Sequence, residues 1–187
     1  MKLPTWRLVV PLLVQVAIPL ALPAEYLAVI AAGRTIYLQT FPVDPYDLLR
    51  GYSQVLGYEF SERDYLQSLP GGKDVVNMKR GSEIYVIFAA PDAPNSTAPK
   101  PWRPVRVCLS LPTDLGPQEI ALKGRLVDGR VVYGIEEMYI PENQRERINA
   151  EVAKASQKRQ AVVEVKVGAS GLALARALWL QGQRYQF

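Results

Sequence analysis

The chain has 187 residues and a formal net charge of +4, with 22 Lys and Arg against 18 Asp and Glu. That length suits one domain plus an appendage, and the basic residues are too scattered to indicate a nucleic-acid partner. Histidine is absent, which excludes Ser-His-Asp and Cys-His nucleophile pairs and histidine ligation of metals or haem. We therefore expect no cofactor and no metal site. The single cysteine, Cys108, lies in an apolar stretch and is expected to act as a small buried hydrophobe.

Residues 1–33 are predicted to form an N-terminal transmembrane anchor. Between Leu8 and Ala32 the only charge is Glu25, and a helix of this length can cross roughly 30 Å of hydrocarbon, with lipid contact through residues 8–32. Lys2 and Arg7 precede the apolar run, so the positive-inside rule places the N-terminus in the cytoplasm. The rest of the chain then lies on the extracytoplasmic side, in the periplasm or an equivalent lumen.

A cleaved signal peptide is the alternative interpretation of the same segment. Leu8 to Leu22 has the length of a signal-peptide core, and Ala31-Ala32-Gly33 offers small residues for cleavage. Three prolines, at positions 11, 19 and 23, predict a bent helix or one that ends at Pro23.

Residues 34–187 are predicted to form one β-rich domain. β-branched and aromatic residues indicate strands, and clusters of Pro, Gly, Asn and Ser indicate loops. We expect single strands at residues 34–41, 53–60, 84–89 and 102–111, and capped helical turns at Asp44–Gly51. A short helix capped by Ser61 or Asp64 should end before Pro70.

Two hairpins are expected in the second half of the chain. Asp128-Gly129 joins residues 120–127 to 130–135 and is the dipeptide best suited to a type I′ turn. Residues 162–167 and 172–180 form the second hairpin. Between the hairpins, residues 141–157 favour a surface helix whose apolar stripe of Ile148, Val152 and Ala155 is too thin for a core helix. About seven strands with short helices indicate a mainly β fold, a small barrel or a sandwich.

Two segments carry a family resemblance. Pro42 to Gly51, followed by Leu56-Gly57-Tyr58-Glu59, resembles the first block of the bacterial GDYxxLxY family of membrane-anchored proteins. Tyr133 to Glu142 is similar to that family's second block, and a glutamine such as Gln15 in the N-terminal helix is also typical. Tyr52 and Ser53 stand where the family has Asp and Tyr. The resemblance implies an anchored domain and carries no established activity.

The favoured function is a non-enzymatic, membrane-tethered interaction or assembly module, an accessory component of a membrane protein complex with an unidentified membrane or extracytoplasmic partner. The carboxylates Asp44, Asp47, Glu136 and Glu137 could form an acid–base pair, but helix capping and strand alternation explain them better. The alternative function is a Ser-Lys hydrolase of the signal-peptidase kind, or its inactive relic. That alternative requires a hydroxyl of Ser53, Ser61, Ser68 or Ser82 to bond Lys73 or Lys79.

The candidate contact surface consists of tyrosines and one arginine, because these residues combine contact area with polar groups. Its members are Tyr46, Arg50, Tyr52, Tyr58, Tyr133 and Tyr139. The competing interpretation is that the tyrosines pack the interior of the β domain and its rim.

Overall fold

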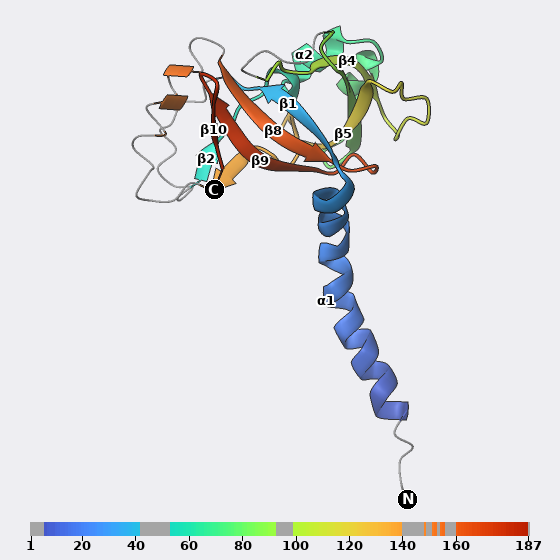
Figure 1. Ribbon diagram of the computed structural model, residues 1–187. Helices are drawn as coiled ribbons and strands as arrows, with labels where there is room; N and C mark the ends of the chain where they lie inside the picture. The colour runs from blue at the N-terminus through green and yellow to red at the C-terminus, as the bar shows by residue number, and fades with distance from the viewer. Residues whose placement is uncertain are drawn as a thin grey trace, which may run out of the picture.

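The computed structural model describes residues 6–41, 53–92, 99–139, 148, 151–152, 154–155 and 160–186. A long N-terminal helix projects from a β domain like a stalk (Figure 1). The C-terminal strands are part of the β domain. The predicted helical turns at Asp44–Gly51 lie outside the described residues.

The stalk is α1 (Trp6–Ala32), which continues through Pro11, Pro19 and Pro23. At about 1.5 Å per residue it is roughly 40 Å long. Large apolar side chains are exposed along it, at Val9, Val10, Leu12, Leu13, Tyr26, Leu27 and Ile30. Among the residues that the structure describes, no helix combines the length and the apolar character needed to cross a membrane.

One antiparallel sheet, called the β1 sheet below, has the order β1-β8-β9-β10. Its strands are β1 (Arg34–Gln39), β8 (Ala161–Val167), β9 (Ala173–Leu180) and β10 (Gln183–Tyr185). Buried and less buried residues alternate along β1, and its buried Ile36 and Leu38 pair with Val165 and Val163 of β8. The predicted β8–β9 hairpin is confirmed. Strand β10 was not predicted, and it follows a turn in which Gln181 and Gly182 have φ of 52° and 88°.

A second antiparallel sheet, the β3 sheet, has the order β4-β3-β5-β6. It contains β3 (Glu83–Ala89), β4 (Arg103–Cys108), β5 (Glu119–Val127) and β6 (Arg130–Val132). Asp128 and Gly129 join β5 to β6 with φ of 48° and 86°, both positive as a type I′ turn requires. The predicted hairpin is therefore confirmed, although β6 ends at Val132 rather than at Ile135.

A short ladder and three short helices complete the described chain. β2 (Ser53–Val55) pairs with β7 (Glu137–Tyr139), so the strand predicted over residues 53–60 is shorter than expected. η1 (Glu59–Ser61), α2 (Arg63–Ser68) and η2 (Gly72–Asn77) follow. The capping prediction for α2 was wrong: Glu62 is its N-cap residue and makes no side-chain cap bond, while Ser61 is buried.

The two four-stranded sheets share one hydrophobic core. Its fully buried side chains include Ile36, Leu38, Phe88, Leu122 and Leu178 from the two sheets, Leu66 from α2, and Tyr58 and Ile135 from the connecting segments. The stripe residues Ile148, Val152 and Ala155 also belong to this core, which corrects the expectation that they contribute little to it. The fold is mainly β, as predicted. Within the described residues it has ten strands rather than about seven, and these do not close into a barrel.

Candidate interaction surface

The structure describes three of the tyrosines predicted to form a contact surface, and two of these three are buried. Tyr46, Arg50 and Tyr52 lie outside the described residues. Tyr58 and Tyr133 are buried, with 1% and 4% of their surface exposed, so for these two the predicted surface role is wrong and the packing interpretation holds. Tyr139 lies in β7, where its backbone pairs with Ser53.

Tyr58 and Tyr133 connect the two segments that carry the family resemblance. The Tyr58 hydroxyl donates to the carbonyl of Ile135 at 2.9 Å, and the Tyr133 hydroxyl donates to the carbonyl of Phe60 at 2.6 Å. Phe60 stacks on Tyr58 at 4.9 Å and meets Tyr133 edge-on at 5.2 Å. Burial raises the pKa of both tyrosines well above the ordinary value, and the nearby Glu136 charge adds to the shift. We call this reciprocal pair the tyrosine clasp.

Glu136 completes the clasp by holding a turn. Its carboxylate accepts backbone hydrogen bonds from Tyr133 at 2.5 Å and Gly134 at 2.8 Å, while its own carbonyl accepts the Leu56 amide at 2.7 Å. Glu136 precedes β7, which begins at Glu137, so the expected alternation of the two acids along one strand was wrong. The carboxylate's backbone bonds give it a structural role.

The hydrolase alternative requires a serine hydroxyl bonded to a lysine, and neither Ser61 nor Ser68 makes such a bond. The Ser61 hydroxyl is buried without a hydrogen-bond partner, and the Ser68 hydroxyl donates to the carbonyl of Tyr65 at 2.6 Å. No cluster of three or more Cys, Asp or Glu side chains suited to a metal ion occurs among the described residues.

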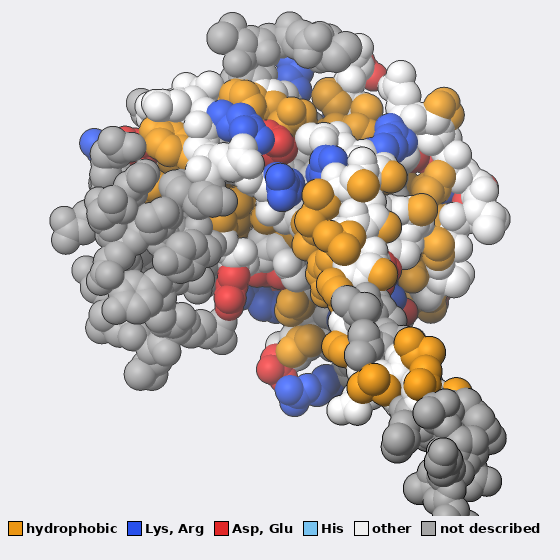
Figure 2. All heavy atoms as spheres, turned by 60° about the horizontal axis from the view of Figure 1, so that its bottom comes forward, with side chains coloured by type: hydrophobic (Ala, Val, Ile, Leu, Met, Phe, Trp, Pro, Cys, Tyr) orange, Lys and Arg blue, Asp and Glu red, His pale blue; other side chains and the backbone are white. Residues whose placement is uncertain are grey.

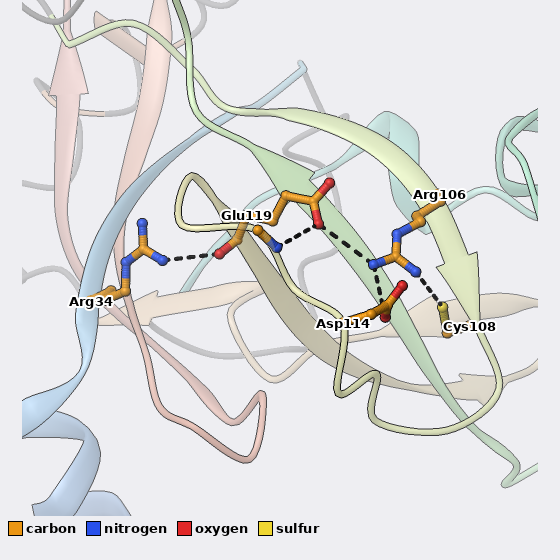
Figure 3. A network of polar contacts seen from close by, with 6 residues as sticks. Arg34, Arg106, Cys108, Asp114 and Glu119 are labelled. Carbon is orange, nitrogen blue, oxygen red and sulfur yellow. Dashed lines mark hydrogen bonds and ion pairs between the residues drawn. The ribbon is translucent and has the colours of Figure 1, made fainter.

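A polar network lies on the outer side of the β3 sheet, away from the shared core. Arg106 bonds Asp114 at 3.2 Å and Glu119 at 3.5 Å, and its other terminal nitrogen lies 3.7 Å from the Cys108 sulfur (Figure 3). The bond to Asp114, more than any other cause, raises the pKa of Arg106. Cys108 is half-buried rather than buried. Arg34 reaches from β1 to the carbonyl of Glu119 at 2.9 Å, which joins the two sheets at this corner.

Among the described residues, aromatic and basic side chains suited to binding another protein lie together on the outer face of the β1 sheet. Tyr37 alternates with the buried Ile36 and Leu38, and its ring meets Trp179 edge-on at a centroid distance of 6.4 Å. Both aromatic side chains are half-buried. Arg176 is the extra residue of a β-bulge where the β8–β9 register shifts. We call this surface the open face: Tyr37, Glu164, Arg176, Trp179 and Arg184.

Glu164 holds the open face in one arrangement. Its carboxylate accepts two hydrogen bonds from the Arg184 guanidinium, at 2.8 and 2.9 Å, and one from the Trp179 indole at 3.0 Å. The Arg184 bond is the largest cause that lowers the pKa of Glu164. Desolvation, followed by the Glu164 charge, raises the pKa of Tyr37. The Trp179 indole and the Arg184 guanidinium are thus held in place before any partner binds.

Sequence reasoning missed the open face. Alternation along residues 34–41 and 162–167 could have placed Tyr37 and Glu164 on the solvent side of their strands. The pairing of β1 with β8, two strands that lie far apart in the sequence, carries no comparable local signal.

Comparison with family models identifies the family of the chain. The family model described as GDYXXLXY protein matches residues 15–178, which is most of the chain. No curated protein and no solved structure matches. The match covers both clasp segments and the open face except for Trp179 and Arg184. The chain therefore belongs to the GDYXXLXY family.

Proposed function

We propose that the chain is a membrane-tethered, non-enzymatic interaction module, an accessory component of a membrane protein complex. The observation that carries the proposal is the open face, where the Glu164 carboxylate holds Trp179 and Arg184 by hydrogen bonds and the Tyr37 ring contacts the Trp179 ring. α1 is the tether, and the β domain lies on the extracytoplasmic side.

The tether is supported by the sequence and by the exposed side chains of α1. No charge occurs from Leu8 to Pro23, and Lys2 and Arg7 precede this run, as in a helix with a cytoplasmic N-terminus. Leu12 and Leu13 expose 59% and 63% of their surface, which is unfavourable in water and favourable in lipid.

The recognition role of the open face rests on its composition and its order. Trp, Tyr and Arg are the residues that most often dominate binding energy at protein interfaces. Half-buried rings lose little conformational entropy when a partner binds. The hydrogen bonds from Trp179 and Arg184 to Glu164 lower this entropy cost further, because they already order both side chains. The partner proposed is another protein of the same membrane, because a tethered module meets such neighbours at high effective concentration.

The recognition role is tested by recovery of partners from detergent-solubilised membranes. Trp179→Ala and Arg176→Ala should each reduce recovery of a specific partner. Loss of a dominant contact weakens the binding free energy by about 1 kcal/mol or more. Val132→Ala is the matched control, since Val132 is 40% exposed on β6, an edge strand of the other sheet. Equal recovery with all three variants would show that the open face does not bind the partner.

The tether is tested by carbonate washing of membranes and by protease added to the extracytoplasmic side. The chain should remain with the membranes, and only its β domain should be digested. Leu13→Arg places a charge in the apolar run at a cost of about 2.5–3.5 kcal/mol and should lower the membrane-bound fraction. Release of a shortened soluble form would replace the anchor with a cleaved signal peptide.

A further inference from the structure

The last turns of α1 are packed closely against the β8–β9 hairpin. Val29 is 2% exposed, and a Cβ added to Gly168 would lie 2.7 Å from a Val29 methyl carbon. A Cβ added to Gly33 would lie 3.1 Å from the carbonyl oxygen of Val167 in β8, as well as 2.4 Å from the Val29 carbonyl oxygen in the last turn of α1. The end of α1 and the hairpin are therefore packed closely at Gly168 and at Gly33.

Polar contacts fix the same junction from two sides. The Ser170 hydroxyl, at the hairpin tip, donates to the Glu25 carboxylate at 2.7 Å. The Lys166 ammonium donates to the carbonyl of Ile30 at 2.6 Å, where it also complements the negative end of the helix dipole. Apolar and polar contacts together join the end of α1 to the hairpin.

The position of Glu25 sets the height of the hairpin tip above the apolar run. Glu25 follows Pro23, the end of the uncharged run, by about 3 Å of helix rise. The headgroup layer on each side of a bilayer is roughly 5–7 Å thick. If the uncharged run lies in hydrocarbon, the tip residues 168–172 lie within one side chain's reach of the headgroup layer.

The surface at this level has the chemistry of a lipid contact. Residues 168–172 carry no charge, and the exposed Tyr26, Leu27 and Ile30 lie on the adjoining part of α1. Lys166 and Lys123 stand beside the tip. The Lys123 amide bonds the Gly171 carbonyl at 2.9 Å, while its ammonium pairs with Glu83 at 2.8 Å. Figure 2 shows hydrophobic side chains continuing from the helix onto the base of the domain, with Lys and Arg side chains next to them.

We propose that the β8–β9 hairpin tip and the adjoining face of α1 rest in the lipid headgroup layer, so that the β domain lies against the membrane in one fixed orientation. This inference rests on the proposed tether. It adds that the domain does not swing freely, and that the open face is held at a constant angle to the membrane.

The test uses the full chain in vesicles of phosphatidylcholine and phosphatidylglycerol that contain a headgroup-nitroxide lipid. A fluorophore is attached to Ala169→Cys at the hairpin tip, in a Cys108→Ser background. The matched control is Gln183→Cys, an exposed position on β10 at the far end of β9, roughly 20 Å away along the strand. Each labelled variant is first checked for folding by thermal melting.

Quenching of the label at position 169 should be at least several-fold stronger than quenching at position 183. Gly168→Val, which displaces Val29, should reduce this difference. Equal quenching at both positions while the chain co-floats with the vesicles would overturn the fixed orientation and leave the tether intact. Failure of the chain to co-float would overturn the tether and this inference with it.

Discussion

Replacement of Tyr58 by Phe tests whether Tyr58 has a structural role in the tyrosine clasp or belongs to an exposed contact surface. The change removes only the hydroxyl that donates to the Ile135 carbonyl at 2.9 Å, and Ile135 is fully buried, so water cannot replace the lost donor. An unsatisfied buried carbonyl costs about 1–3 kcal/mol. The ring remains in place against Phe60, so no cavity forms and no further cost is expected from packing.

The loss should be measured by thermal melting of the full chain in detergent, followed by tryptophan fluorescence. For a chain of this size a loss of 2 kcal/mol lowers Tm by about 4–8 °C. Tyr37→Phe is the matched control, because Tyr37 is half-buried on the open face and its ring contact with Trp179 is retained. If Tyr58→Phe changed stability by less than about 0.5 kcal/mol, as surface substitutions usually do, the clasp would be refuted.

Three further predictions follow from other parts of the fold. Gly33→Ala should loosen the α1 junction, because the new methyl group would lie 2.4 Å from the Val29 carbonyl at the end of α1 and 3.1 Å from the Val167 carbonyl of β8; spin labels on α1 and β8 should then give a broader distance distribution. Gly129→Ala should lower stability by about 1 kcal/mol in a urea titration, since φ there is 86° and the added methyl has no neighbour within 4 Å, leaving backbone strain as the only cause. The pKa of Glu164 is lowered in the folded state, so its interaction with Arg184 stabilises the fold above the ordinary glutamate pKa and is lost as the pH falls through the lowered value. Glu164→Gln should therefore lose about 1 kcal/mol at neutral pH and little in acid, as followed by urea titrations at several pH values, and an equal loss at every pH would contradict the assigned role.

Much of the fold could be predicted because its signals are local. The Asp128-Gly129 turn needs only the conformational preferences of its own residues, and its positive φ values agree with them. Strand β10 was not predicted because the turn before it places Gln181 at a positive φ, which glutamine seldom adopts. The apolar stripe at Ile148, Val152 and Ala155 was undervalued because the sequence does not reveal how much core surface lies opposite it.

The candidate site was harder to predict because tyrosine suits both a core and an interface. Tyr58 and Tyr133 become core residues through carbonyl groups contributed by a segment more than seventy residues away, at separations of 77 and 73 positions. Trp179 and Arg184 become neighbours of Tyr37 only through the strand order of the β1 sheet. Non-local pairing of this kind cannot be read from one sequence.

The central claim, a tethered module that binds through the open face, is tested most directly by photo-crosslinking in intact cells. A photoreactive amino acid replaces Thr35, which is exposed on β1 two residues from Tyr37, or Val132 as the control, and is activated before the membranes are isolated and washed with carbonate. Position 35 should give a discrete higher-mass adduct in the membrane fraction and position 132 should not. An adduct from position 132 alone, or the chain in the supernatant, would contradict the claim.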